Sequence, residues 1–115
     1  MSGKFSRDKG ANEERRVCRL LRSIGFTAKR LLSQYQESTG CDIATNAPLC
    51  IQCKTGKSLP VKGAFLEAVA SATPSEEPVG WYHWTGGPRV VMVREEYFLD
   101  LLKRTKTDET DTVPN

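Results

Sequence analysis

The residues best suited to chemistry lie in the stretch 40–54, which reads GCDIATNAPLCIQCK. It contains an acid, Asp42, followed by an amide, Gln52, and an amine, Lys54. A tight turn at residues 46–48 separates two runs that are typical of short strands. Because alternate side chains of a strand share a face, Gln52 and Lys54 fall on one side, and Asp42 lies near the start of the preceding strand. The three groups can therefore converge at a sheet edge, where they could hold a hard cation through oxygen ligands.

The opposite face of the second strand would carry Leu49, Ile51 and Cys53, which are apolar and suited to a core. A half-exposed hairpin with a solvated polar face fits the same spacing equally well. Spacing alone therefore leaves a structural and a chemical interpretation of Asp42, Gln52 and Lys54 open.

The elements that must position this stretch begin with an amphipathic helix from residues 10–12 to about residue 24, before Gly25. Its inward face is predicted from the helical spacing of Val17, Leu20, Leu21 and Ile24. Two acids, Glu13 and Glu14, lie in its first turn. An acid there stabilises the helix N-terminus, but one of the two could also join Asp42, and the two roles do not exclude each other.

The rest of the chain predicts further strands and helices in alternation. Trp81 and His83 would lie on one strand face, Tyr82 and Trp84 on the other, and at least one of these faces would belong to the core. The order of elements is typical of a mixed α/β sheet with helices on its faces. The expected ranges are a strand at 26–33, a helix at 62–72, strands at 80–84 and 89–93, and a helix at 95–104 with Phe98, Leu101 and Leu102 inward.

The length of 115 residues suits one domain. We expect a flexible basic arm at 1–9, a domain at 10–104 and a disordered tail at 105–115. Residues 1–30 carry nine Lys or Arg against three acids, a distribution that favours a polyanionic partner, although a solvated arginine-rich helix face would look the same. No apolar run is long enough to span a bilayer and no signal core begins the chain, so we expect a cytoplasmic protein.

The four cysteines include one CxxC pair, Cys50 and Cys53. A structural zinc site is disfavoured, because no second pair exists and the single histidine, His83, lies far along the chain. A disulfide is disfavoured too, because no secretion signal is present. We therefore expect small, partly buried thiols.

Two parts of the sequence resemble one nuclease superfamily. Asp42 followed by Gln52-Cys53-Lys54 resembles the D…(E/Q)xK signature of the PD-(D/E)xK nucleases. The upstream chain is similar to the opening of the archaeal and phage Holliday junction resolvases, and the matching residues are Gly10, Glu14-Arg15, Val17, Leu21, Gly25-Phe26 and Arg30. The resemblance covers roughly residues 9 to 57, about half of the chain.

The resemblance implies a restriction-endonuclease-like fold, a mixed β-sheet flanked by helices with an α-β-β-β-α-β core. It implies a Mg²⁺-dependent endonuclease (Mn²⁺ being a possible substitute) that acts on branched DNA as a homodimer, in a host cytoplasm if the chain is phage-encoded. Asp42, Gln52, the Cys53 carbonyl and Glu14 would hold the metal, with Glu13 as the competitor of Glu14. Catalysis would use Glu14, Asp42, Gln52, Lys54 and Ser33, the last in competition with Ser38. DNA would contact Lys9, Arg15, Arg30 and Lys57.

Gln52 departs from the commoner Glu of the superfamily, although some branches do carry Gln. A neutral amide is a weaker ligand, so Glu14 would be needed more to hold the metal. Two alternatives stay open: a nuclease of the same fold that acts on nicked, flap, mismatched or single-stranded DNA, and a non-catalytic nucleic-acid-binding or protein-interaction domain.

Overall fold

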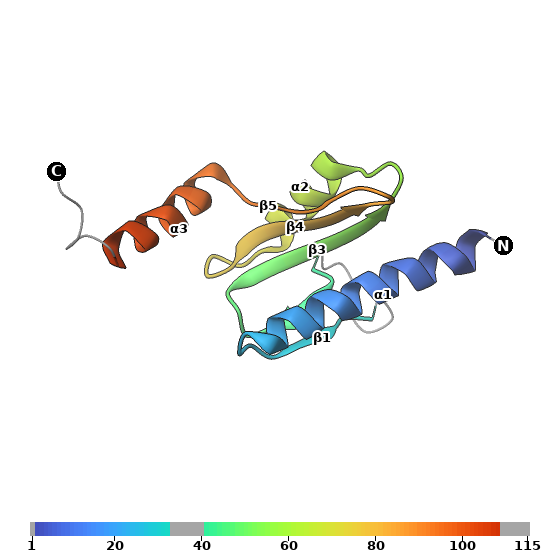
Figure 1. Ribbon diagram of the computed structural model, residues 1–115, viewed down its shortest axis with the longest axis horizontal. Helices are drawn as coiled ribbons and strands as arrows, with labels where there is room; N and C mark the ends of the chain where they lie inside the picture. The colour runs from blue at the N-terminus through green and yellow to red at the C-terminus, as the bar shows by residue number, and fades with distance from the viewer. Residues whose placement is uncertain (1, 33–40, 109–115) are drawn as a thin grey trace.

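The computed structural model describes residues 2–32 and 41–108, with side chains for residues 8–32 and 41–106. Its helices are separated by runs of strands, and the first helix and the last lie near opposite ends of the molecule (Figure 1). In chain order they are α1 (Ser2–Ser23), β1 (Ala28–Arg30), β2 (Ile43–Thr45), β3 (Leu49–Gly56), α2 (Val61–Ser71), β4 (Glu77–Trp84), β5 (Arg89–Met92) and α3 (Glu95–Asp108).

The strands form two sheets. β1 and β2 pair antiparallel, and β3, β4 and β5 form a mixed sheet in that order. β3 runs parallel to β4, whereas β4 and β5 are antiparallel. A parallel pair needs a crossover connection, and α2 supplies it between β3 and β4. The predicted α/β class with a mixed sheet and flanking helices is therefore confirmed.

β3 is the buried centre of the fold. Its residues from Cys50 to Cys53 are all buried, because α1 lies over one face of the strand and α2 over the other (Figure 1). A strand covered on both faces has no solvated side, which explains why the predicted half-exposed hairpin is wrong. The predicted apolar face is confirmed, since Ile51 and Cys53 belong to the core and Leu49 packs against it; the α1 members of this core are Val17, Cys18 and Leu21.

The other face of the sheet is fixed by Tyr82, which is fully buried. Its hydroxyl donates a hydrogen bond of 3.1 Å to the carbonyl oxygen of Val61, at the start of α2. Gly80 makes room for the ring, because a Cβ at this position would collide with it. The ring of Trp84 lies edge-on to Tyr82 at 6.3 Å. The predicted core role of one aromatic face is thus confirmed, and α2 is held over the polar side of β3.

The first helix is longer than the sequence predicted. It begins at Ser2, so the range expected as a flexible arm, 1–9, is helical in its described part, and the expected start at residues 10–12 is too late. Two residues of the predicted inward face, Leu20 and Ile24, are exposed, Ile24 to 70%. The inward face of α1 is narrower because it packs mainly on β3 and on the short strand β1, which is limited to Ala28–Arg30.

The last helix departs from expectation in a different way. α3 projects from the end of the sheet (Figure 1), and its predicted inward residues Phe98, Leu101 and Leu102 are exposed. The helix continues to Asp108, into the predicted tail, and residues 109–115 lie outside the described part. Within the described residues, no helix combines the length and the apolar composition required to cross a membrane.

Candidate functional site

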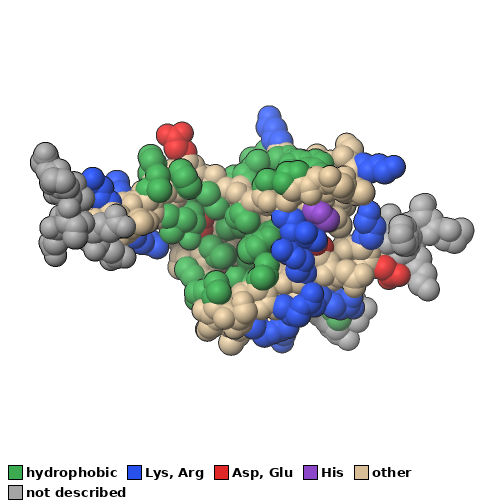
Figure 2. All heavy atoms as spheres, in the orientation of Figure 1, with side chains coloured by type: hydrophobic (Ala, Val, Ile, Leu, Met, Phe, Trp, Pro, Cys, Tyr) green, Lys and Arg blue, Asp and Glu red, His purple; other side chains and the backbone are tan. Residues whose placement is uncertain are grey.

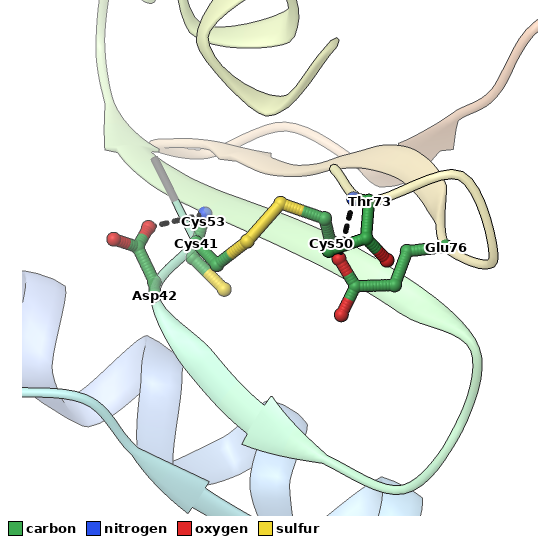
Figure 3. The surroundings of a disulfide bond; sticks show 6 residues. All are labelled: Cys41, Asp42, Cys50, Cys53, Thr73 and Glu76. Atoms are coloured by element: carbon green, nitrogen blue, oxygen red, sulfur yellow. Dashed lines mark hydrogen bonds between the residues drawn. A yellow bond between two sulfur atoms is a disulfide. The ribbon is translucent and has the colours of Figure 1, made fainter. Parts of the chain in front are cut away.

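Asp42 is held against β3 by its backbone and by its side chain. Its amide N–H donates to the Ile51 carbonyl oxygen at 2.7 Å, and its Oδ2 accepts a 2.7 Å hydrogen bond from the Cys53 amide (Figure 3). Its own carbonyl oxygen accepts from the Leu31 amide at 2.9 Å, which ties it to the segment after β1. Asp42 therefore bridges the two sheets, and its carboxylate is fixed at the edge of β3.

A disulfide joins Cys41 and Cys50 next to this contact (Figure 3). The prediction of free thiols is therefore wrong for this pair, and it is confirmed only for Cys18 and Cys53, which are buried thiols. The two half-cystines meet because the turn after β2 returns the chain along itself, with nine residues of sequence separation between them. The bond fastens the residue before Asp42 to the first half of β3.

Glu14 approaches Asp42 from α1. Its Oε1 accepts a 2.8 Å hydrogen bond from Arg30 Nε, an ion pair that links α1 to β1. Burial raises the pKa of Asp42 to about 6. The hydrogen bond from the Cys53 N–H and the positive charge of Lys54 oppose this rise, whereas the negative charges of Glu14 and Glu67 add to it. The name acidic centre is used below for Glu14, Asp42 and Lys54, whose charges interact at this edge of β3.

The remaining predicted residues of β3 have different environments. Gln52 is buried, with 4% of its surface exposed, and it shares a face of β3 with Lys54, which is half-buried. Cys53 points to the opposite face and its thiol is buried in the core. Burial raises the pKa of this thiol, and the charges of Asp42, Glu14 and Glu13 raise it further. The Cys53 side chain is thus an inert core group, and its backbone is the part that meets Asp42.

Glu13, the neighbour of Glu14, belongs to a separate cluster. It is 6% exposed and accepts hydrogen bonds of 3.1 and 3.3 Å from Arg89 and one of 3.3 Å from Arg16. His83 Nδ1 lies 3.9 Å from its Oε1. Of the two acids, Glu14 is therefore the one whose charge acts on Asp42, whereas Glu13 is engaged by Arg16 and Arg89. Sequence reasoning missed the partner Arg89, which is 76 positions away and has no local signal.

The predicted DNA-contacting cations are spread over the surface. Lys9 Nζ donates to Thr85 Oγ1 at 3.3 Å, and Arg15 donates to Asn12 Oδ1 at 2.9 Å. Arg30 is engaged with Glu14, and Lys57 is exposed in the loop after β3. The predicted serine, Ser33, and its competitor, Ser38, lie outside the described residues.

Among the residues that the structure describes, the fold assembles a group of potential metal ligands at a place that the sequence did not predict. The sulfurs of Cys41 and Cys50 and a carboxylate oxygen of Glu76 lie within 4.8 Å of one another. In the disulfide the two sulfurs are not thiolates, the form that binds metals. This group is therefore no ligand set while the disulfide is intact.

Comparison of the chain with protein-family models, with curated proteins and with solved structures yields no match. The site must be interpreted from its own geometry. Two carboxylates and an amine at one strand edge can bind a divalent cation and place a positive charge beside it.

Proposed function

We propose that this protein is a metal-dependent, structure-selective DNA endonuclease that hydrolyses phosphodiester bonds, with the four-way Holliday junction as its substrate. The observation that carries the proposal is the acidic centre, where Glu14, Asp42 and Lys54 interact at one edge of β3. Burial, in the first place, raises the pKa of Asp42 to about 6, and the negative charge of Glu14 adds to the rise. A bound cation would stabilise the charged form of this carboxylate.

The order of elements supports the proposal. A helix, three strands, a crossover helix and a strand parallel to β3 follow one another, as in the α-β-β-β-α-β core of the PD-(D/E)xK nucleases that the sequence resembles. The antiparallel β1–β2 pair forms its own sheet beside β3, and β5 and α3 are additions to this order. The acid then lies directly before β2 and the amine lies on β3, in the order of the D…(E/Q)xK signature.

The donor set suits Mg²⁺ or Mn²⁺. Asp42 and Glu14 offer carboxylate oxygens and the Cys53 carbonyl would add a neutral oxygen, and hard cations prefer such ligands. The Gln52 side chain, which the sequence predicted as a further ligand, is buried on the face of β3 that α2 covers, whereas Glu14 belongs to α1 on the other face. When bound, the cation lowers the pKa of a water molecule and neutralises charge on the phosphate. Because Gln52 carries no charge, the ion depends on Glu14 for its second negative ligand.

The remaining work falls to the protein's own groups. The Cys53 N–H fixes the orientation of the Asp42 carboxylate, and Arg30 fixes that of Glu14. Lys54, on the neighbouring strand position, would orient the attacking water or stabilise the oxygen that develops negative charge. These groups are positioned before substrate arrives, so little reorganisation is needed during the reaction.

The proposal includes a homodimer. A four-way junction presents two equivalent strands, and a two-fold dimer places two sites on them symmetrically. Helix α3 exposes four apolar side chains, Phe98, Leu99, Leu101 and Leu102, and a second copy of the chain would cover them. Sedimentation of the parent and of Leu102→Glu measures the oligomeric state. We expect the parent to be a dimer and the variant a monomer, and a monomeric parent would remove the dimer from the proposal.

A cleavage assay with Mg²⁺ separates the candidate functions. Symmetric nicks in a synthetic four-way junction, with duplex and flap controls uncut, are the expected result. Cleavage of the controls but not of the junction would assign the same chemistry to another DNA structure. Binding of DNA without cleavage in Mg²⁺ or Mn²⁺ would instead favour a non-catalytic nucleic-acid-binding domain.

The matched pair of variants for this assay is Asp42→Asn and Asp100→Asn. Both remove one carboxylate, but Asp100 is an exposed residue of α3 paired with Lys103 at 4.0 Å. We expect Asp42→Asn to abolish cutting while it retains DNA binding, and Asp100→Asn to cut at the parental rate. Parental cutting by Asp42→Asn would show that the acidic centre is not the catalytic site.

A further inference from the structure

A cavity of about 360 Å³ lies between α1 and the end of the β4–β5 hairpin. It is called the basic cavity here, because its charged lining consists of four cations, Lys9, Arg16, Arg19 and Arg89, and one acid, Glu13. Figure 2 shows Lys and Arg side chains gathered around the histidine, His83, that also lines it. We propose that the basic cavity binds a backbone phosphate of the nucleic acid, next to the phosphate that the acidic centre would cleave.

The arginines of the cavity are preorganised by Glu13. The buried carboxylate of Glu13 accepts hydrogen bonds from Nε and Nη2 of Arg89 and from one nitrogen of Arg16. Glu13 is 6% exposed, whereas the side chains of Arg16 and Arg89 are 33% and 40% exposed. A ligand therefore meets the outer edges of two guanidinium groups that are already fixed, and the entropy lost on binding is small.

The lining suits a phosphate group better than an apolar ligand. Guanidinium groups offer forked N–H donors that match phosphate oxygens, and lysine adds a point charge. The hydroxyls of Thr55 and Thr85 provide further donors, and Thr85 already accepts a hydrogen bond from Lys9 at 3.3 Å. Four positive side chains against a single negative one leave the cavity strongly electropositive.

The position of the cavity points to a polyanion instead of a small free anion. Glu13 precedes Glu14 on α1, and Thr55 follows Lys54 on β3, so the same segments of the two elements carry the cavity and the acidic centre. A nucleic-acid strand presents phosphates in succession and can occupy both places at once. This step rests on the proposed function, because it takes the acidic centre as the place where a phosphodiester is held.

The test is the salt dependence of DNA binding, measured in EDTA so that no cleavage occurs. Fluorescence anisotropy with a labelled four-way junction, in sodium chloride from 50 to 200 mM, gives the slope of log K against log salt concentration. We expect Arg19→Ala and Lys9→Ala each to reduce that slope by about 0.9 and to weaken binding several-fold. Both residues lie outside the buried core, so the variants should remain folded, which their thermal midpoints will verify.

The matched control is Arg104→Ala, which removes an exposed arginine of α3 and should keep the parental slope. Parental slopes for Arg19→Ala and Lys9→Ala would overturn the proposal. A second reading uses inorganic phosphate alone: if it raises the thermal midpoint of the parent but not of Arg19→Ala while the DNA slopes stay equal, the cavity is a small-anion site and the nucleic-acid proposal fails.

These outcomes are separable from those of the cleavage assay. Reduced slopes without cleavage of any DNA would leave the cavity proposal standing and reject the nuclease. Cleavage of the junction with unchanged slopes would support the nuclease and reject the cavity proposal.

Discussion

Glu13 and Glu14 are consecutive on α1, yet the fold gives them opposite electrostatic surroundings. The carboxylate of Glu13 is shared by Arg16 and Arg89, with His83 nearby, so positive charge dominates there. Glu14 has one partner, Arg30, and lies close to a second acid, Asp42. Consecutive helical residues point about 100° apart, which is enough to give the two side chains different neighbours. One helical turn thus supplies an acid to a cation-rich cluster and another to a pair of acids.

The contrast bears on the phosphate chemistry that we propose. The basic cavity is satisfied internally, because its acid orients its arginines. The acidic centre is not satisfied in this way. Burial raises the pKa of Asp42 to about 6, although the Cys53 N–H and Lys54 both oppose the rise. Groups left in unfavourable electrostatic surroundings are typical of functional sites and destabilise the fold.

The largest expected effect separates the two acids by activity. Glu14→Gln should lower Mg²⁺-dependent cleavage at saturating DNA by about 100-fold, because it removes the second negative ligand of the cation. Glu13→Gln should change the same rate less than threefold per folded molecule. Single-turnover kinetics on the junction measures both, and equal losses in the two variants would erase the distinction between the regions.

The next effect concerns the disulfide, which adjoins only the acidic centre. Replacing Cys41 and Cys50 together by Ser should lower the free energy of unfolding by about 2–3 kcal/mol, because the nine-residue separation is no longer closed in the unfolded chain. Cleavage should fall as Asp42 loosens, whereas the salt dependence of DNA binding should be unchanged. A reductant added to the double variant serves as the control, and any further loss there would assign the effect to Cys18 or Cys53.

A smaller effect distinguishes the regions by pH. The folded-state pKa of Asp42 is raised from 3.8 to about 6, so the folded protein binds this proton more tightly than the unfolded chain. The contribution of Asp42 to the free energy of unfolding therefore falls as the pH rises from about 4 to 6, and it stays low above that range. The free energy of unfolding of Asp42→Asn should exceed that of the parent by about 1–2 kcal/mol at pH 7.5, and the two should be equal near pH 4. Urea unfolding at both pH values checks this; the same difference at each would refute it, and Asp100→Asn is the control.

The smallest effect belongs to the basic cavity. Glu13→Gln leaves Arg16 and Arg89 without their carboxylate, but both are partly exposed and water can solvate them. The free energy of unfolding should fall by about 1 kcal/mol, well short of a fully buried pair. The double-mutant cycle with Arg89→Met isolates the pair, and a coupling energy near zero would show that Glu13 does not orient Arg89.

Local patterns were sufficient to predict the strand that carries the candidate site. The turn at residues 46–48 and the apolar alternation of Leu49, Ile51 and Cys53 depend on neighbours in sequence, and both are observed. The burial of Gln52 could not be predicted from alternation, because it depends on α2 returning over that face. The sequence-based order of elements is also observed, with boundaries shifted most at α1 and β1.

The features that were missed depend on contacts between distant residues or on packing. The pairing of Cys41 with Cys50 follows from the path of the chain after β2, and the argument from a missing secretion signal had no bearing on that geometry. The Glu13–Arg89 contact joins the first helix to the last strand. The apolar spacing of α3 predicted a buried face, but spacing does not say what will cover it, and Phe98 remains exposed.

The most direct test of the central claim, that Glu14 and Asp42 form a divalent-cation site, is Mn²⁺ binding followed by electron paramagnetic resonance in the absence of DNA. The parent should bind Mn²⁺ at pH 7.5, bind it more weakly below pH 6 as Asp42 gains a proton, and lose binding in Asp42→Asn but not in Glu13→Gln. An Asp42→Asn variant that binds Mn²⁺ as the parent does, or a parent that binds none, would contradict the account.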